Sequence, residues 1–274
     1  MKKKLLSLLT LVFLLTLAPL KLGLCSNWYP YVKLEPSTFT WKEFDDQGNL
    51  LLKEQGSALF LGIGIWNEIV PRWILHSQLE IFLAPNVKYQ GHTMSGIPVT
   101  TTNKWLGVSL ETLGGVNFPI FDNKLNLSIL GGVGDFTWLR SISTTTLSNG
   151  TVVYGYTEHW ENVYLKVESK LSFLIISKLK FSFEGGMLYP IFVSNEAKLP
   201  GMLDTSQVYP KGTLSPFFQV ALSSSNFKLG LSYVKFSFKK SSPDTVTSVS
   251  GDLYLIWQPD STFSILKAFI EVYF

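Results

Sequence analysis

Hydrophobic residues at every second position, over segments of about ten residues, constrain the fold of this chain more than any other feature. In one such segment Leu165 and Val167 alternate with Lys166 and Glu168. After residue 26 no apolar run approaches the ~18 residues of a membrane-spanning helix. Alternation on this scale is typical of a transmembrane β-strand, in which one face meets lipid and the other meets a polar interior. The sequence therefore predicts an all-β protein that forms an antiparallel transmembrane β-barrel.

The lengths of the connections predict the number of strands. Strand-like segments lie at 37–45, 49–66, 73–92, 97–114, 124–142, 155–173, 177–192, 213–224, 227–240 and 254–274. Connections are short at 67–72, 115–123, 174–176 and 225–226, and long and polar at 143–154, 194–212 and 241–251. Single-chain outer-membrane barrels have an even strand number, short periplasmic turns and long outer loops. We therefore expect about 10 strands, within a range of 8 to 12, and we assign residues 251–257 to an outer extension of the last strand.

The first 25 residues have the layout of a cleaved secretory signal peptide. Lys2, Lys3 and Lys4 form a positive region, and an apolar region follows over residues 5–20. Cleavage after Cys25 leaves residues 26–274 as the barrel, whereas a lipoprotein signal, which bulky Leu24 disfavours, would have Cys25 acylated. Because Cys25 is the only cysteine, the mature chain has no disulfide. Removing this segment takes the formal charge from +3 to −1, so we expect no nucleic-acid partner.

The carboxyl terminus ends on a strand that finishes in an aromatic residue. Leu266, Ala268, Ile270, Val272 and the final Phe274 share one parity. This pattern resembles the last strand of bacterial outer-membrane β-barrels, which the outer-membrane assembly machinery reads. The resemblance implies that the protein is exported to the cell outer membrane, contacts its lipid, and carries its assembly signal at Phe274.

A second resemblance covers about a quarter of the chain. Residues 39–56, the run Tyr233, Phe236 and Ser241, and residues 258–261 are similar to a group of uncharacterised porin-like outer-membrane proteins of Gram-negative bacteria. This similarity implies the same fold and location, and it transfers no catalytic residue.

Tryptophan positions are consistent with a bilayer. Trp66 and Trp73 flank the turn at 67–72, and Trp138 and Trp160 flank the polar stretch at 141–158. Indole rings favour the interface between headgroups and hydrocarbon. We therefore expect these residues in aromatic girdles, the alternative being core tryptophans of a soluble barrel.

Charged residues gather on the inward parity of the predicted strands. The candidates for the lumen lining are Glu80, Glu111, Lys166, Glu168, Lys170, Lys180, Glu184, Lys228, Lys267 and Glu271. Ten strands enclose an interior that side chains nearly fill, and buried charges must pair. The lumen is therefore either closed by ion pairs or a narrow pore whose charges select the solute.

Catalytic chemistry has weaker support in the sequence. His76, His92 and His159 have no metal-ligand spacing, and we expect neither a metal nor a cofactor. His76 and Ser77 cannot form a dyad, because adjacent strand residues point to opposite faces. The glycines of residues 131–134 lack the lysine of a phosphate loop and more simply give room to bulky neighbours. The first functional hypothesis is a structural or narrow porin-like barrel, and the alternatives are an outer-membrane enzyme acting on lipid A or peptides, or an adhesin that displays its loops.

Overall fold

The computed structural model describes residues 27–70, 72–92, 96–121, 124–176 and 178–274, so the expected signal peptide lies outside the described residues. Ten strands form a closed antiparallel barrel, and the predicted fold class is confirmed. They are β1 (Asn27–Phe44), β2 (Leu50–Val70), β3 (Trp73–His92), β4 (Pro98–Ile120), β5 (Leu125–Ile142), β8 (Thr157–Ile176), β9 (Leu179–Ala197), β12 (Ser215–Ser223), β13 (Phe227–Lys239) and β16 (Asp260–Tyr273). Each pairs with its neighbour in sequence, and β1 pairs with β16 to close the ring. None of the described residues forms a helix long and apolar enough to cross a membrane.

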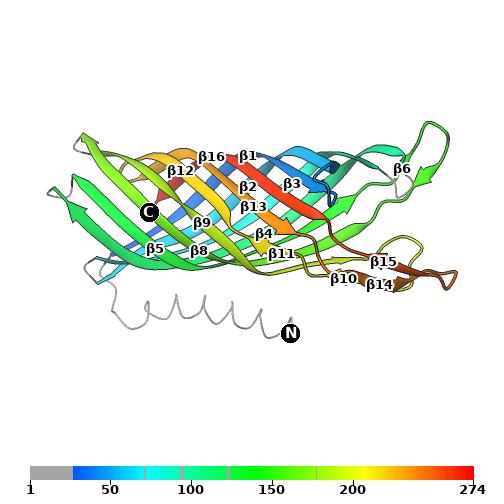
Figure 1. Ribbon diagram of the computed structural model, residues 1–274. Coiled ribbons are helices and arrows are strands. Elements are labelled where there is room, and N and C mark those ends of the chain that lie inside the picture. Colours follow the sequence, from blue (N-terminus) through cyan, green and yellow to red (C-terminus); the bar gives the residue numbers. More distant parts are fainter. Residues whose placement is uncertain (1–26, 71, 93–95, 122–123, 177) are drawn as a thin grey trace.

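Several short strands lie at one end of the barrel. They are β6 (Thr145–Thr146), β7 (Val152–Val153), β10 (Ser206–Val208), β11 (Lys211–Thr213), β14 (Asp244–Thr247) and β15 (Leu253–Ile256). Figure 1 shows β6, β10, β14 and β15 together at this end, which we call the loop end. The opposite end, where β2 to β3, β4 to β5, β8 to β9 and β12 to β13 connect through brief turns, is the turn end.

Several predicted strand boundaries were wrong, since β4 runs to Ile120 and not to 114, β9 runs to Ala197 and not to 192, and the first and last strands also differ. Residues 251–257 do not extend the last strand, because Leu253–Ile256 pairs with Asp244–Thr247 in a separate hairpin and β16 begins only at Asp260. The first strand begins at Asn27 and not at residue 37, because residues 27–36 pair with β2 and, in part, with β16. Pro30 and Pro36 interrupt the alternation of apolar and polar residues here, so the pattern did not predict this part of the strand.

The two parities of each strand meet different surroundings. On β3, Ile81 is 48% exposed on the outer surface, whereas Glu80 is 4% exposed inside the barrel. The outward residues form an apolar belt that includes Val32, Leu61, Ile63, Leu106, Leu165, Val167, Phe181, Phe183, Ile191, Leu231 and Ile270. Most of the polar and charged residues of the predicted inward parity lie in the interior, which is the arrangement expected of a strand that separates lipid from a polar lumen.

Two glycines make room for inward tyrosine rings. A Cβ atom on Gly134 would lie 2.3 Å from the ring of Tyr164, and one on Gly64 would lie 2.3 Å from the ring of Tyr31. Both tyrosines sit on the neighbouring strand directly opposite the glycine. The glycines at 131–134 therefore include one that a bulky neighbour requires, which is a packing role.

Candidate functional site

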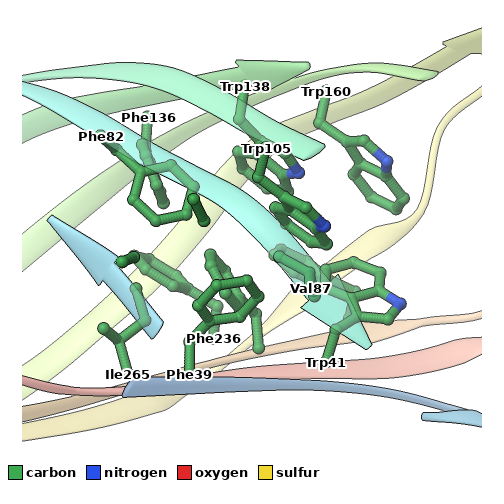
Figure 2. Packing of buried hydrophobic residues seen from close by; sticks show 14 of the residues in the cluster. Phe39, Trp41, Phe82, Val87, Trp105, Phe136, Trp138, Trp160, Phe236 and Ile265 are labelled. Carbon is green, nitrogen blue, oxygen red and sulfur yellow. The ribbon is translucent and has the colours of Figure 1, made fainter. Parts of the chain in front are cut away.

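A dense group of aromatic side chains fills the interior toward the loop end. We call it the aromatic plug, and it consists of Phe39, Trp41, Phe60, Phe82, Trp105, Phe136, Trp138, Trp160, Phe236, Phe238 and Phe263. Figure 2 labels most of these rings, which come from several strands and pack on one another. Trp138 lies parallel to Trp160 with ring centroids 5.4 Å apart, and Trp41 meets Trp160 edge-on at 4.9 Å. These separations are those of favourable aromatic pairs, so the rings pack directly on one another.

The prediction that Trp138 and Trp160 belong to an aromatic girdle was wrong. Their exposures are 1% and 0%, and both lie in the plug. Each tryptophan shares its parity with a charged inward neighbour, Arg140 or Glu158, so the rings must point into the barrel. Of the other pair, Trp66 stacks on His76 with centroids 4.0 Å apart, and Trp73 is 56% exposed at the turn end.

One buried arginine sits at the outer edge of the plug. The guanidinium of Arg140 on β5 contacts carboxylates from three other strands: Glu43 at 3.2 Å, Glu54, and Glu158 at 2.9 Å. We call these four residues the Arg140 cluster. Its members are 0% to 8% exposed, so the ion pairs are shielded from water.

Each glutamate of the Arg140 cluster also accepts a hydrogen bond from a plug tryptophan. The indole N–H groups of Trp41, Trp105 and Trp160 donate to Glu43, Glu54 and Glu158, each over 2.8 Å. None of the four residues of the Arg140 cluster was among the predicted lumen residues. A usable signal was a tryptophan two residues from a charge, at 41 and 43, 138 and 140, and 158 and 160, because such spacing puts both on one face of a strand.

A layer of ion pairs fills the interior between the plug and the turn end. Its members are Lys33, Glu35, Glu80, Glu111, Lys166, Glu168, Lys170, Glu184, Lys228, Lys267 and Glu271. Lys166 contacts Glu111 at 2.9 Å and Glu168 at 3.0 Å, and Lys267 contacts Glu35 at 2.6 Å. Most of these charges therefore have two partners, which offsets the cost of burying them.

The structure brings nine of the ten predicted lumen residues into this ion-pair layer. Lys180 is the exception, because it is exposed at the turn end and no ion pair joins it to a described residue. Lys33 and Glu35 were missed, since they lie on the part of β1 that the alternation did not reveal. His76, expected as a hydrogen-bonded lumen residue, lies 2.8 Å from the hydroxyl of Tyr31 through Nε2.

Among the hollows that the described residues line, three lie in the interior or at its two mouths and bear on function. A central cavity of about 120 Å³ lies between the ion-pair layer and the plug, with Gln78, Ser109 and Phe136 among its lining residues. At the turn end a vestibule of about 630 Å³ is lined by Lys170, Lys178, Lys180, Lys228 and several serines and asparagines. The described residues of this vestibule include no carboxylate side chain.

The third hollow, the loop-end groove, has a volume of about 640 Å³. Its lining residues are Glu43, Leu51, Leu52, Tyr89, His92, Tyr156, Glu158, Asn195, Ala197, Leu199, Ser206, Val208, Tyr254, Leu255, Ile256, Trp257, Gln258 and Pro259. Small-ligand pockets typically measure about 300–1,000 Å³ and combine apolar walls with a few polar groups. The groove therefore has the size and the lining of a ligand site.

Three of the buried polar atoms that lack a hydrogen-bond partner belong to residues of the loop-end groove, and others, such as Ser182 Oγ and Ser261 Oγ, lie elsewhere in the barrel. Asn195 Oδ1, Ser206 Oγ and Gln258 Nε2 are buried and make no hydrogen bond with the described residues. A buried polar atom left without a partner costs about 1–3 kcal/mol. Such atoms are rare in folded proteins and call for an explanation, which a bound molecule can supply.

No family model matches the chain, and no curated protein matches it in sequence. Among solved structures it is similar to the outer membrane protease OmpT from Escherichia coli, with a TM-score of 0.61 and 8% identity over 91% of this chain and 97% of OmpT. The chain has the fold of an outer-membrane β-barrel. Weaker matches to the barrel are the β domain of the Bordetella autotransporter BrkA (TM-score 0.43, 10% identity, 88% and 99% covered) and Neisserial surface protein A (0.35, 9%, 91% and 100%). At 8% identity the similarity to OmpT shows a shared fold and carries no activity.

His76 and His92 contact groups other than a carboxylate. His92, which lines the groove, has Nδ1 3.4 Å from the carbonyl oxygen of Leu51. His76 meets Tyr31, and the neighbouring Ser77 contacts Thr112 Oγ1 at 3.2 Å, so the two do not form a dyad. Phe274, the expected assembly signal, is 77% exposed, and its N–H donates to the carbonyl of Pro30 over 3.0 Å.

Proposed function

We propose that this protein is an integral outer-membrane β-barrel with a closed lumen, whose loop end faces the exterior and presents a binding surface. The apolar belt supports a membrane location, because a row of exposed leucine, isoleucine and phenylalanine side chains needs lipid around it. The turn end faces the periplasm in this proposal, in keeping with the short-turn rule of bacterial barrels.

The aromatic plug is the observation that carries the closed lumen. Trp41, Trp138 and Trp160 come from three strands, and their rings are within 6.3 Å of one another. The Arg140 cluster binds three of the plug tryptophans and so fixes the rings in place. This packing supports a structural barrel in preference to a porin-like channel, because a conducting pore needs a continuous wet path.

The loop-end groove supports a binding role for the outer face. It lies where β9 (Leu179–Ala197), β10 (Ser206–Val208) and β15 (Leu253–Ile256) come together above the plug. Display of a surface site corresponds to the third functional hypothesis, an adhesin that displays its loops. We do not propose proteolysis, because the likeness to OmpT is one of fold and His92 contacts a main-chain carbonyl.

Planar-bilayer conductance of the refolded protein tests the closed lumen. We expect no stable single-channel steps from the wild-type barrel. Steps should appear in the combined variant Trp138→Ala, Trp160→Ala and Phe263→Ala, because Trp138 contacts both other rings and all three point inward. The matched control is Trp73→Ala, which removes an exposed ring at the turn end and should stay silent. Stable steps from the wild-type protein would overturn the proposal.

A further inference from the structure

Three polar side chains that line the loop-end groove have unused hydrogen-bonding capacity. Asn195 and Gln258 pair through Asn195 Nδ2 and Gln258 Oε1 at 3.0 Å, which leaves Asn195 Oδ1 as an acceptor and Gln258 Nε2 as a donor. Ser206, 3% exposed, lies on β10 beside the end of β9 and keeps an unpartnered hydroxyl. A ligand that carries adjacent donors and acceptors can satisfy all three atoms.

Aromatic rings form another part of the groove wall. Trp257 is 46% exposed and Tyr254 is 40% exposed, and Tyr89 and Tyr156 are half-buried in the same lining. Flat amphipathic rings of this kind offer an apolar face to one side of a ligand at little entropic cost. The groove thus combines apolar platforms with neutral amide and hydroxyl groups.

The charged residues that line the groove limit which chemical classes of ligand it can bind. Glu43 and Glu158 belong to the lining, and its described residues include no lysine or arginine. Each of these carboxylates uses one oxygen for both Arg140 and its tryptophan. Lys240 Nζ lies 5.2 Å from the ring centroid of Trp257, but it pairs with Asp46 at 2.8 Å, so the two carboxylates of the lining still disfavour phosphate, sulfate and uronate groups.

An extended peptide is disfavoured at the neighbouring strand edge. Peptides commonly bind such an edge by adding a strand through main-chain hydrogen bonds. On β10 the N–H of Gln207 donates instead to Asp244 Oδ2 over 2.9 Å. Because Asp244 already accepts this N–H, its side chain covers a donor that an added strand would need.

From these observations we infer that the loop-end groove binds an uncharged saccharide, with Asn195, Ser206 and Gln258 bonding its hydroxyl groups and Trp257 or Tyr254 packing on a ring face. This inference rests on the proposed exposure of the loop end at the cell surface. A saccharide is the ligand class that carries dense neutral donors and acceptors together with flat C–H faces, which the lining matches.

Binding to an array of oligosaccharides tests the inference with the refolded mature barrel in detergent. The probes are neutral oligosaccharides such as maltotriose, cellotriose and N,N′,N″-triacetylchitotriose, together with sulfated and uronate-containing oligosaccharides and a tripeptide containing lysine. We expect at least one neutral probe to bind and the anionic probes not to bind. Calorimetric titration of the best neutral probe then gives the affinity of each variant.

Ser206→Ala is the sharpest variant, because it removes a hydroxyl that has no partner in the described structure and so loses no internal hydrogen bond. We expect the affinity to fall about tenfold at an unchanged melting temperature. The matched control is Ser182→Ala, which removes another buried and unpartnered hydroxyl on β9 outside the groove lining and should leave the affinity unchanged. Trp257→Ala should reduce the affinity by about tenfold or more, since it removes an exposed platform.

The results separate this inference from the proposed function. Suppose that the barrel conducts no ions and binds no neutral probe, or binds only the anionic probes or the peptide. This result would contradict the saccharide inference and leave the proposed closed lumen unaffected. Equal affinity of Ser206→Ala, Trp257→Ala and wild type would overturn it too, because the unpartnered atoms would then serve ordered water only. A conducting wild-type barrel would overturn the proposed closed lumen whether or not saccharide binds.

Discussion

Nη1 of Arg140 lies 2.9 Å from Oε2 of Glu158, the residue directly opposite it on the neighbouring strand. The same nitrogen also lies 3.2 Å from Oε1 of Glu43, which is 97 residues away in sequence on β1. One side chain therefore links β5 and β8 to β1, and β1 borders neither of them. This contact across the lumen links strands on opposite sides of the aromatic plug.

Removing the arginine should leave three buried glutamates without their cation. We expect Arg140→Met to lower the free energy of unfolding by about 3–5 kcal/mol, because uncompensated buried charges are costly. Urea unfolding in detergent micelles, followed by tryptophan fluorescence, measures this change. Lys88→Met, at an exposed position of β3, is the control and should shift stability by no more than about 0.5 kcal/mol. Equal stability of the two variants would contradict the role of the Arg140 cluster.

Glu184 is held between two lysines, with Lys228 Nζ at 3.2 Å and Lys170 Nζ at 3.3 Å from the same oxygen. In a closed lumen, Glu184→Gln should cost about 3–5 kcal/mol of stability, because the two cations lose their shared carboxylate. Thermal unfolding measures this loss. In a wet pore the same change would leave stability unaltered and shift the reversal potential instead, so measuring both quantities on one variant distinguishes the two states of the lumen.

Leu165 and Lys166 are neighbours on β8 with opposite surroundings. Leu165 is 49% exposed on the apolar belt, while Lys166 pairs with Glu111 inside. We expect Leu165→Arg to cost about 2–4 kcal/mol if the position lies near the bilayer midplane, since the charge has no partner in lipid. Lys166→Arg preserves an interior cation and should be tolerated. The stability of each variant is measured after refolding into liposomes of defined lipid. If Leu165→Arg is as stable as the wild type and Lys166→Arg is destabilised, the outward and inward faces have been assigned the wrong way round.

Phe274 offers a test of assembly. Deleting this residue should reduce the amount of barrel recovered in the outer membrane far more than Ser143→Ala, a change in the connection after β5. The expected reason is that the assembly machinery reads the exposed terminal ring, which is 77% accessible. Heat-modifiable migration of the membrane fraction on gels measures folded barrel. Equal yields of the two variants would rule out Phe274 as the signal.

Asp45 provides a pH test in the turn between β1 and β2. A hydrogen bond from the Asn49 side chain, together with main-chain N–H donors, lowers the pKa of the Asp45 carboxyl from its usual value. A lowered folded-state pKa means that the contribution of this turn is present above the unfolded pKa and is lost as the pH falls through the folded value. Carbon-13 NMR titration should show the pKa of Asp45 rising in Asn49→Ala. An unchanged titration would show that Asn49 does not hold the carboxylate.

The sequence by itself determined the barrel, its strand number and most of its inward charges. Alternation with a period of two assigns each residue to one of two faces, so Leu165 and Lys166 can be placed outside and inside without a structure. Connection lengths then order the strands, because each short turn joins antiparallel neighbours. The same logic failed at β1, where Pro30 and Pro36 interrupt the pattern, and at residues 251–257, where a local hairpin satisfies the alternation as well as a barrel strand would.

Only the tertiary structure decided which inward residues meet and what fills the lumen. Parity places Trp138 and Trp160 beside Arg140 and Glu158, yet it does not say whether the interior is narrow enough for rings from opposite walls to touch. The contact between Arg140 and Glu43 also depends on closure of the whole ring of strands, which no local pattern encodes. The loop-end groove depends on the same closure, because Asn195, Ser206 and Gln258 come from separate segments that the barrel wall brings together. Local periodicity thus encodes the wall of this barrel, and long-range packing creates its plug and its candidate binding site.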